Sequence, residues 1–341
     1  MRPVKEALAR YLQSRMPSAS DVSISNLSRI PGGASRETWM FDARWGEGGE
    51  RRRGDFILRL DPPASLVESD REVEYTFYDV FAESEVPVPR MRWLEQDPGH
   101  LGAPFFIMDR ILGCDSSPRV ILEPRYQPHH PMLGRRMYET LGAIHRFDWR
   151  GTAIAKVVAV PAADEAWRVQ LDYWEGMIDK NEQSPQPIIR AAVRWLRAHP
   201  PPPAQRVTVV HGDYRVGNFL YTAEGIHAVV DWEMAHLGDP LEDLAWSLHE
   251  VWEWGRDGKK GGIIDAEEAT HTYESAGALA VDREALHWWD IFSGVKGQGI
   301  WLTGARSYAD RRTTQLIMVT TAYWLVNFQD EVVLRSLGRG A

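Results

Sequence analysis

The 341-residue chain contains a single cysteine, Cys114, which excludes a disulfide within the chain and a metal site built from several cysteines. Cysteine-poor chains are typical of reducing compartments, so we expect a cytoplasmic location. No apolar run reaches about 18 residues, the length expected of a membrane-spanning helix, and we expect no membrane contact. The formal net charge of −9 argues against a nucleic-acid partner, because phosphate backbones require a basic surface.

The rest of the composition is that of an ordinary globular protein, with 44% apolar and 26% charged residues. The length favours two lobes that share a cleft over one compact unit. The basic residues of segment 1–16 are also found in transit peptides. Glu6 and the spacing of Val4, Leu8 and Leu12 instead favour an amphipathic helix.

The first third of the chain predicts a small antiparallel sheet. A polar, glycine-rich tip at 46–55 separates two of the strands, and segment 65–84 has the periodicity of a helix that packs against the sheet. The expected strands are 22–30, 37–45, 56–61, 90–96 and 103–112.

Beyond about residue 130 the pattern becomes helical, first at 132–147, 166–179 and 187–199. A strand–loop–strand insert at 206–231 interrupts the helices, which then continue to the end of the chain. Most of the fifteen tryptophans lie in this second part. We therefore predict a boundary near residue 110, with an N-lobe at 1–110 and a helical C-lobe at 111–341.

The insert contains the chain's most informative stretch, VVHGDYRVGNFL at 209–220. Asn218 follows Asp213 by five positions, and Asp231 ends the next apolar strand. If the two short strands form a hairpin, these oxygen ligands meet at one edge. Such a set suits Mg²⁺, and the remaining carboxylate could accept a proton from a hydroxyl group. Taken singly, each of these residues could instead cap a loop or face solvent.

The combined pattern HGDYRVGN…VVDWE resembles the Brenner motif of the aminoglycoside phosphotransferase-like kinases. These are relatives of the protein kinases, which carry H-R-D-x-x-x-x-N followed by D-F-G. The strand FILRLD carries arginine where many kinases have lysine. In this the chain is similar to the branch related to acyl-CoA dehydrogenase-linked phosphotransferase domains.

The resemblance implies an α+β, bilobal, protein-kinase-like fold and an ATP- and Mg²⁺-dependent small-molecule kinase. By the same resemblance, Asp213 is the catalytic base, and Asn218 and Asp231 hold the metal. His211 is expected to be structural, and the roles of Arg215 and Glu233 stay open. The short gap after Asp231 and the missing A-P-E argue against a protein substrate.

The resemblance also implies a nucleotide site. Segment 31–35, PGGAS, resembles a phosphate-covering loop, and Arg59 takes the place of the phosphate-binding lysine. Glu72 is the expected ion-pair partner of Arg59, with Glu74 as the alternative. The adenine is expected against the backbone of the strand end. The predicted nucleotide-binding residues are Gly32, Gly33, Ala34, Ser35, Arg59, Glu72, Asp109, Arg110 and Ile111.

The later segment GDPLEDLAW predicts a helix start, with Asp239 as N-cap and Glu242 and Asp243 at the positive end of the helix. We expect these residues to be structural. The tryptophan-rich segments after it are expected to line the acceptor site. The acceptor is then a hydroxyacyl-type or aromatic metabolite. An antibiotic kinase that acts on aminoglycosides and a regulatory pseudokinase are the alternatives.

Overall fold

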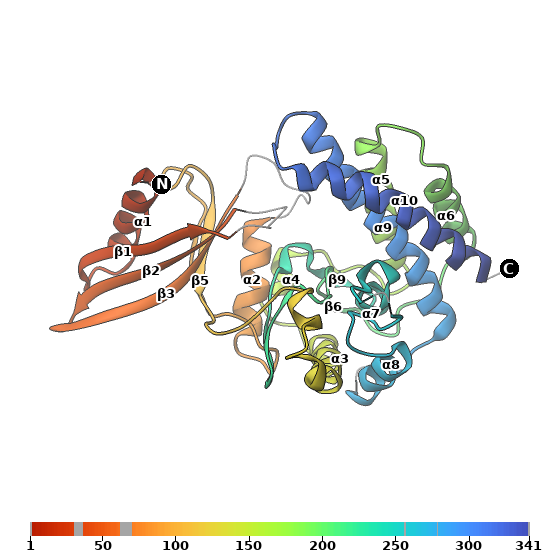
Figure 1. Cartoon of the computed structure of the whole chain (residues 1–341), viewed down its shortest axis with the longest axis horizontal. Helices are drawn as coiled ribbons and strands as arrows, with labels where there is room; N and C mark the ends of the chain where they lie inside the picture. Colours follow the sequence, from red (N-terminus) through yellow and green to blue (C-terminus); the bar gives the residue numbers. More distant parts are fainter. Residues whose placement is uncertain (1, 31–36, 62–69, 256, 278, 340–341) are drawn as a thin grey trace.

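The computed structural model describes residues 2–30, 37–61, 70–255, 257–277 and 279–339. A five-stranded sheet with two helices forms one lobe, and a mostly helical region forms the other (Figure 1). The predicted α+β, bilobal fold is confirmed. The predicted phosphate loop with Gly32, Gly33, Ala34 and Ser35 lies outside the described residues.

The N-terminal sheet is antiparallel throughout and has the strand order β1-β2-β3-β5-β4. All five predicted strands are present. Their bounds are β1 Ser20–Arg29, β2 Glu37–Glu47, β3 Glu50–Leu60, β4 Met91–Glu95 and β5 Phe105–Asp109.

The tip between β2 and β3 is shorter than the sequence predicts. Glu47 pairs with Glu50, and only Gly48 and Gly49 connect them, with φ of 58° and 83°. Two consecutive positive φ angles favour glycine and suit the right-handed twist of a hairpin. The polar residues assigned to a loop at 46–55 therefore continue the two strands as an exposed ribbon.

Two helices cover the sheet. The predicted first helix is confirmed as α1 Arg2–Arg15, which packs its buried Leu8, Tyr11 and Leu12 against the sheet. α2 Arg71–Phe81 begins at its N-cap Asp70, and it lies between the sheet and the helical lobe (Figure 1).

The helical lobe is organised around α9, which is buried along most of its length and contacts α5, α6, α7 and α10. No helix among the described residues is long and apolar enough to cross a membrane. The helices of this lobe are α3 His130–Arg146, α4 Ile154–Val157, α5 Ala166–Asn181, α6 Pro187–Ala198, α7 Leu241–Leu248, α8 Ala266–Ser275, α9 Arg283–Ala309 and α10 Leu316–Arg339.

Two short strand pairs position the loop at 211–218. β7 Phe219–Thr222 and β8 Gly225–Val229 form the predicted hairpin. β6 Thr208–Val210 pairs with β9 His236–Gly238, a strand that the sequence does not predict. The loop starts from one pair and ends at the other, so its residues lie close to the segment that follows β8.

Candidate active site

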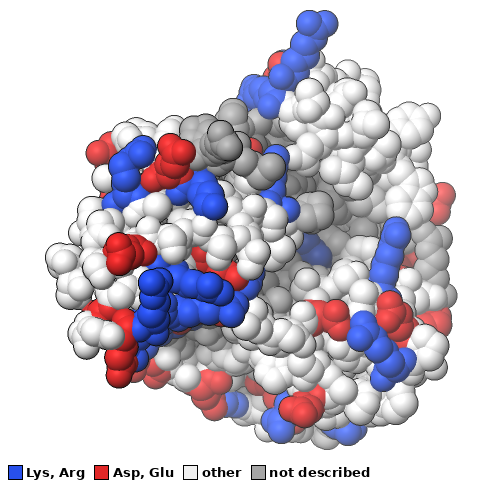
Figure 2. Space-filling view, turned by 60° about the vertical axis from the view of Figure 1, so that its left-hand side comes forward, with Lys and Arg blue, Asp and Glu red and all other residues white. Residues whose placement is uncertain are grey.

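A cavity of about 740 Å³ lies between the two lobes, where the surface is hollowed (Figure 2). Residues from β3, the end of β5, the loop at 211–218 and the segment after β8 line it. Seven predicted site residues are among them: Arg59, Asp109, Arg110, Ile111, Asp213, Asn218 and Asp231. Arg215 and Glu233, whose roles the sequence leaves open, also line the cavity, whereas Glu72 does not.

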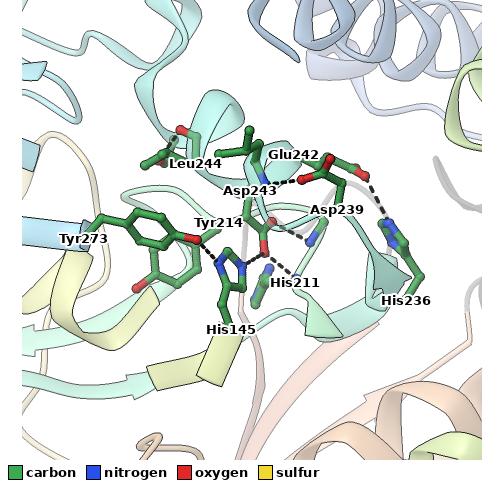
Figure 3. Close-up of polar contacts among 12 residues, drawn as sticks. His145, His211, Tyr214, His236, Asp239, Glu242, Asp243, Leu244 and Tyr273 are labelled. Carbon is green, nitrogen blue, oxygen red and sulfur yellow. Dashed lines mark hydrogen bonds and ion pairs between the residues drawn. The ribbon is translucent and has the colours of Figure 1, made fainter. Parts of the chain in front are cut away.

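The loop at 211–218 is held by Asp243 of α7. The Asp243 carboxylate accepts hydrogen bonds from the backbone N–H groups of His211 and Gly212, at 2.6 and 2.9 Å. Figure 3 shows the carboxylate between His211 and His145, whose Nε2 lies 3.4 Å away. Burial raises the pKa of Asp243, but His145, His211 and Lys296 together hold that pKa below its ordinary value. The expected structural role of Asp243 is confirmed.

Glu242, its neighbour, lies in the first turn of α7, as the sequence predicts. It is buried and pairs with Lys296 at 2.7 Å and with His236 at 3.0 Å.

His211 has the structural role that the sequence predicts. Its Nδ1 accepts a hydrogen bond from the Asp213 backbone at 3.1 Å, and its Nε2 donates to the Val230 carbonyl at 3.1 Å. One ring nitrogen accepts and the other donates, as in a neutral imidazole. Burial lowers the pKa of His211, which also favours the neutral form.

The residue between His211 and Asp213 must be glycine for two reasons. Gly212 has a φ of 82°, and a Cβ atom there would lie 2.4 Å from the Met234 carbonyl oxygen. The loop therefore approaches the segment after Asp231 more closely than any side chain allows.

The Asp213 carboxylate is surrounded by donors. Its Oδ1 accepts from Arg215 Nε at 2.9 Å and from Trp246 Nε1 at 2.7 Å, and its Oδ2 accepts from Asn218 Nδ2 at 2.7 Å. The sequence does not predict the Trp246 contact. A signal was available, because Trp246 follows Asp243 by three positions and therefore shares its helix face.

Asp231 has left-handed backbone angles, with φ of 73° and ψ of 53°. Its N–H donates to the Tyr78 hydroxyl at 2.8 Å, and its Oδ1 accepts from Arg59 at 2.7 Å. Burial alone would raise the pKa of Asp231, but Arg59, with smaller contributions from Arg215 and His211, lowers it below its ordinary value. A strained, ionised carboxylate in a cavity is typical of functional sites.

Arg59 pairs with Glu74, at 3.3 Å, and the prediction of Glu72 as its partner is wrong. The Glu72 side chain is exposed, and its backbone N–H donates to the N-cap Asp70. That cap fixes the helix phase, so that Glu74 shares the buried face of Phe77 and Phe81. Burial alone would lower the pKa of Arg59, but Glu74 and Asp231 raise it well above its ordinary value.

The strand end at 109–111 offers its backbone to the cavity. The Asp109 side chain pairs with Arg92 at 2.7 Å, and the Arg110 side chain with Asp42 at 2.8 Å. The Asp109 and Arg110 N–H groups are bonded to backbone carbonyls, whereas that of Ile111 has no acceptor among the described residues. This amide is the donor at the strand end that is left for a ligand.

One wall of the cavity is aromatic and comes from the predicted tryptophan-rich segments. Trp252, Ile300 and Trp301 line it, and the Arg215 guanidinium lies 4.4 Å from the centre of the Trp252 ring. Trp288 and Trp289 of the same segments are buried in the core of the helical lobe.

A family model described as the APH phosphotransferase enzyme family matches residues 26–283. The chain belongs to this family. The predicted resemblance is confirmed, and membership makes the chain a phosphotransferase of the kinase-like type.

Curated relatives support the predicted branch. The chain is 29% identical over 206 residues to acyl-CoA dehydrogenase family member 10 of Mus musculus, a match that covers 56% of this chain and 18% of the relative. It is 26% identical over 250 residues to acyl-CoA dehydrogenase family member 11 of Gallus gallus, a match that covers 71% of this chain and 30% of the relative. The chain thus spans less than a third of the length of these relatives.

Solved structures share the fold across nearly the whole chain. A putative aminoglycoside phosphotransferase from Ralstonia eutropha has a TM-score of 0.69 at 21% identity, covering 97% of this chain and 98% of the other. The aminoglycoside phosphotransferase APH(4)-Ia, solved with ADP and hygromycin B, has a TM-score of 0.62 at 16% identity, covering 97% and 98%. At sequence identities of 21% and 16%, these two comparisons support a shared fold and no more than that.

Proposed function

We propose that this APH-family phosphotransferase transfers the γ-phosphoryl group of ATP to a hydroxyl group of a small molecule. The observation that carries the proposal is the convergence of Asp213, Asn218 and Asp231 on one cavity, with Arg59 bonded to Asp231. A base, two oxygen ligands and a cation in this arrangement match the needs of phosphoryl transfer.

Asp213 is the base of the proposed reaction. Its carboxylate orients the acceptor hydroxyl and takes its proton as the oxygen bonds to the γ-phosphorus. The bond from that phosphorus to the β,γ-bridging oxygen breaks, and ADP leaves with the electron pair. Positioning and electrostatics account for most of the catalysis in such reactions.

Asn218 and Asp231 are the proposed Mg²⁺ ligands, and their free oxygens fit this role. The Asn218 amide nitrogen is bonded to Asp213, and Asp231 Oδ1 is bonded to Arg59. Among the described residues, nothing bonds to the side-chain carbonyl oxygen of Asn218 or to Asp231 Oδ2, and these two oxygens are the proposed ligand atoms. No group of three or more His, Cys, Asp or Glu side chains among the described residues could hold a metal. The remaining ligands would be phosphate oxygens and water, as is usual for Mg²⁺, which would neutralise phosphate charge.

The nucleotide is proposed to lie against the N-lobe, residues 1–110. Its adenine would face the backbone at 109–111, where the Ile111 amide is available as a donor. Arg59 would contact phosphate oxygens, and the loop with Gly32, Gly33, Ala34 and Ser35 would cover them. The C-lobe, residues 111–341, would supply the acceptor site.

The acceptor is proposed to be a hydroxyacyl-type or aromatic metabolite. Trp252, Ile300 and Trp301 make an apolar wall beside Asp213, and Arg215 adds a positive charge to it. An aminoglycoside carries several positive charges and would need carboxylates on that wall. The relatives named as acyl-CoA dehydrogenase family members favour a thioester-linked hydroxyl.

Competing panels of acceptors test the proposal. Purified protein with Mg·ATP is incubated with hydroxyacyl thioesters and, separately, with aminoglycosides, and ADP formation is followed. We expect turnover of one or more thioesters and a loss of about 10²–10⁴-fold in Asp213→Ala. Asp265→Ala, which changes an exposed carboxylate outside the cavity, is the matched control. Turnover of aminoglycosides alone would overturn the acceptor class. Nucleotide binding with equal, background activity in wild type and Asp213→Ala would favour the pseudokinase.

A further inference from the structure

The indole of Trp246 contacts the proposed base from outside the loop that carries it. Trp246 belongs to α7 and is fully buried, with 0% of its surface exposed. Its Nε1 donates to Asp213 Oδ1 at 2.7 Å, a short distance that is typical of a bond to a charged acceptor. This contact bridges 33 residues of sequence and joins the loop to the core of the helical lobe.

The donors around Asp213 are divided unequally between its two oxygens. Each carboxylate oxygen has about two lone-pair positions. Oδ1 accepts from both Trp246 and Arg215, whereas Oδ2 accepts only from Asn218 among the described residues. One position therefore remains, and it is on Oδ2.

The Trp246 ring is itself fixed in place. Lys296 Nζ lies 5.0 Å from its ring centre, and the Trp252 ring meets it edge-on with centres 5.2 Å apart. Lys296 is buried and bonded to Glu242 at 2.7 Å, with both side chains 1% exposed. Figure 3 shows that Glu242 also faces His236. A cation over the ring face is attracted by the π electrons, so the ring has little freedom to turn.

The other donor to Oδ1 is less firmly held, although its guanidinium lies 4.4 Å from the centre of the Trp252 ring. Arg215 lies on the same loop as Asp213, two residues further on, and its side chain is 22% exposed. It fixes the carboxylate less well than Trp246 does, because its backbone belongs to the loop itself and its side chain is partly exposed. Trp246 is anchored in α7, beside the Asp243 that holds the loop backbone.

We propose that Trp246 is a positioning residue that holds Asp213 Oδ1 so that Oδ2 receives the proton of the acceptor hydroxyl. This rests on the proposed function of Asp213 as the base. Trp246 does not contact the reacting atoms in this scheme, and it acts by fixing the carboxylate plane. Its loss lowers the rate of the chemical step and leaves nucleotide binding intact.

Trp246→Phe tests the positioning role, with water as the acceptor and Mg·ATP as the probe. Phosphate release gives kcat and KM for Mg·ATP hydrolysis. We expect kcat to fall about tenfold with KM within about twofold of wild type. The matched control is Trp288→Phe, since Trp288 is also buried and its Nε1 donates to the Leu196 carbonyl, away from the cavity. An equal kcat in both variants, or a change in KM alone, would overturn the proposal.

An NMR measurement tests the contact itself and does not depend on activity or on the stability of Trp246→Phe. In protein labelled with ¹⁵N-tryptophan, the indole signal of Trp246 should lie downfield and move upfield in Asp213→Ala. The Asp265→Ala variant should leave it in place. An unmoved signal in Asp213→Ala would overturn the contact. If the contact is found but wild type neither binds nor hydrolyses Mg·ATP, the proposed function fails, and the catalytic part of this proposal fails with it.

Discussion

The Arg59 guanidinium and the Glu74 carboxylate lie 3.3 Å apart, and they join β3 to α2 inside the smaller lobe. Their side chains are 8% and 0% exposed, so water screens neither charge. Arg59 also reaches Asp231 of the larger lobe at 2.7 Å. One guanidinium thus connects the sheet, the helix and the segment after β8.

Glu74→Gln should destabilise the protein because Arg59 and Arg71, which are both buried and both paired with Glu74, each lose a counter-charge. We expect the free energy of unfolding to fall by about 2–4 kcal/mol, as for a broken buried ion pair. Glu72→Gln is the matched variant, because Glu72 is exposed and lies two positions away. It should change the free energy of unfolding by less than about 1 kcal/mol. Urea unfolding followed by tryptophan fluorescence measures both. Similar losses in the two variants would contradict the pairing.

Gly212→Ala should distort the loop that carries Asp213. The φ of 82° disfavours alanine, and the new Cβ would lie 2.4 Å from the Met234 carbonyl oxygen. We expect a loss of about 2 kcal/mol or more in stability. Gly176→Ala is the control, since Gly176 is exposed in α5 and a Cβ there meets nothing within 4 Å. It should stabilise the helix by about 0.5–1 kcal/mol, and the same thermal-unfolding experiment reports on both.

Asp231→Asn should uncouple nucleotide binding from the metal. If Asp231 is a ligand, Mg²⁺ tightens ATP binding in wild type, and the variant loses about tenfold or more of that effect. Calorimetric titration with ATP, with Mg²⁺ and with excess chelator, measures the difference. Asp265→Asn should behave as wild type. An undiminished Mg²⁺ effect in Asp231→Asn would remove this residue from the metal site.

Asp239 should make stability depend on pH. Burial raises its pKa to about 6 in the fold, whereas an unfolded aspartate has about 3.9. The folded state therefore binds the proton up to a higher pH than the unfolded state does. The stability that protonated Asp239 contributes is complete below about pH 4 and is lost as the pH rises through 6. Raising the pH from about 4 to about 6 should therefore lower the free energy of unfolding by about 2 kcal/mol, on the scale of about 1.4 kcal/mol for each pKa unit.

The Asp239→Asn variant isolates this contribution, because asparagine is neutral at both pH values and can still accept from the Leu241 N–H, now bonded to Asp239 at 2.9 Å. Its stability relative to wild type should rise by about 2 kcal/mol from pH 4 to pH 7, as measured by urea unfolding. A difference that stays constant would contradict the raised pKa of the buried acid.

The sequence predicts the features whose signals are local. The N-terminal strands follow from apolar and β-branched runs between turn residues, and the β7–β8 hairpin follows from its short turn. The residues of the loop at 211–218 are recognisable from their spacing. The five-stranded sheet and the lining of the cavity by Asp213, Asn218 and Asp231 were predictable for these reasons.

Other features depend on how elements dock, which spacing alone does not give. The choice of Glu74 over Glu72 depends on the N-cap that sets the phase of α2 against β3. The contact of Trp246 with Asp213 depends on the docking of α7. β9 has only three residues, too few to produce a periodic signal, and it forms because β6 lies beside it.

Asp243 holds the loop at 211–218 through backbone N–H groups, and this has a consequence for how the protein can change. A backbone anchor does not depend on the side chains around it, so the loop keeps its shape when other residues of the cavity are exchanged. The aromatic wall comes from the segments around Trp252 and Trp301, which do not contribute to that anchor. Substrate preference can therefore be rebuilt at the wall, by evolution or by an engineer, while the backbone of the loop at 211–218 keeps its shape. Trp252, which packs against Trp246, is the part of the wall that also bears on the Asp213 carboxylate.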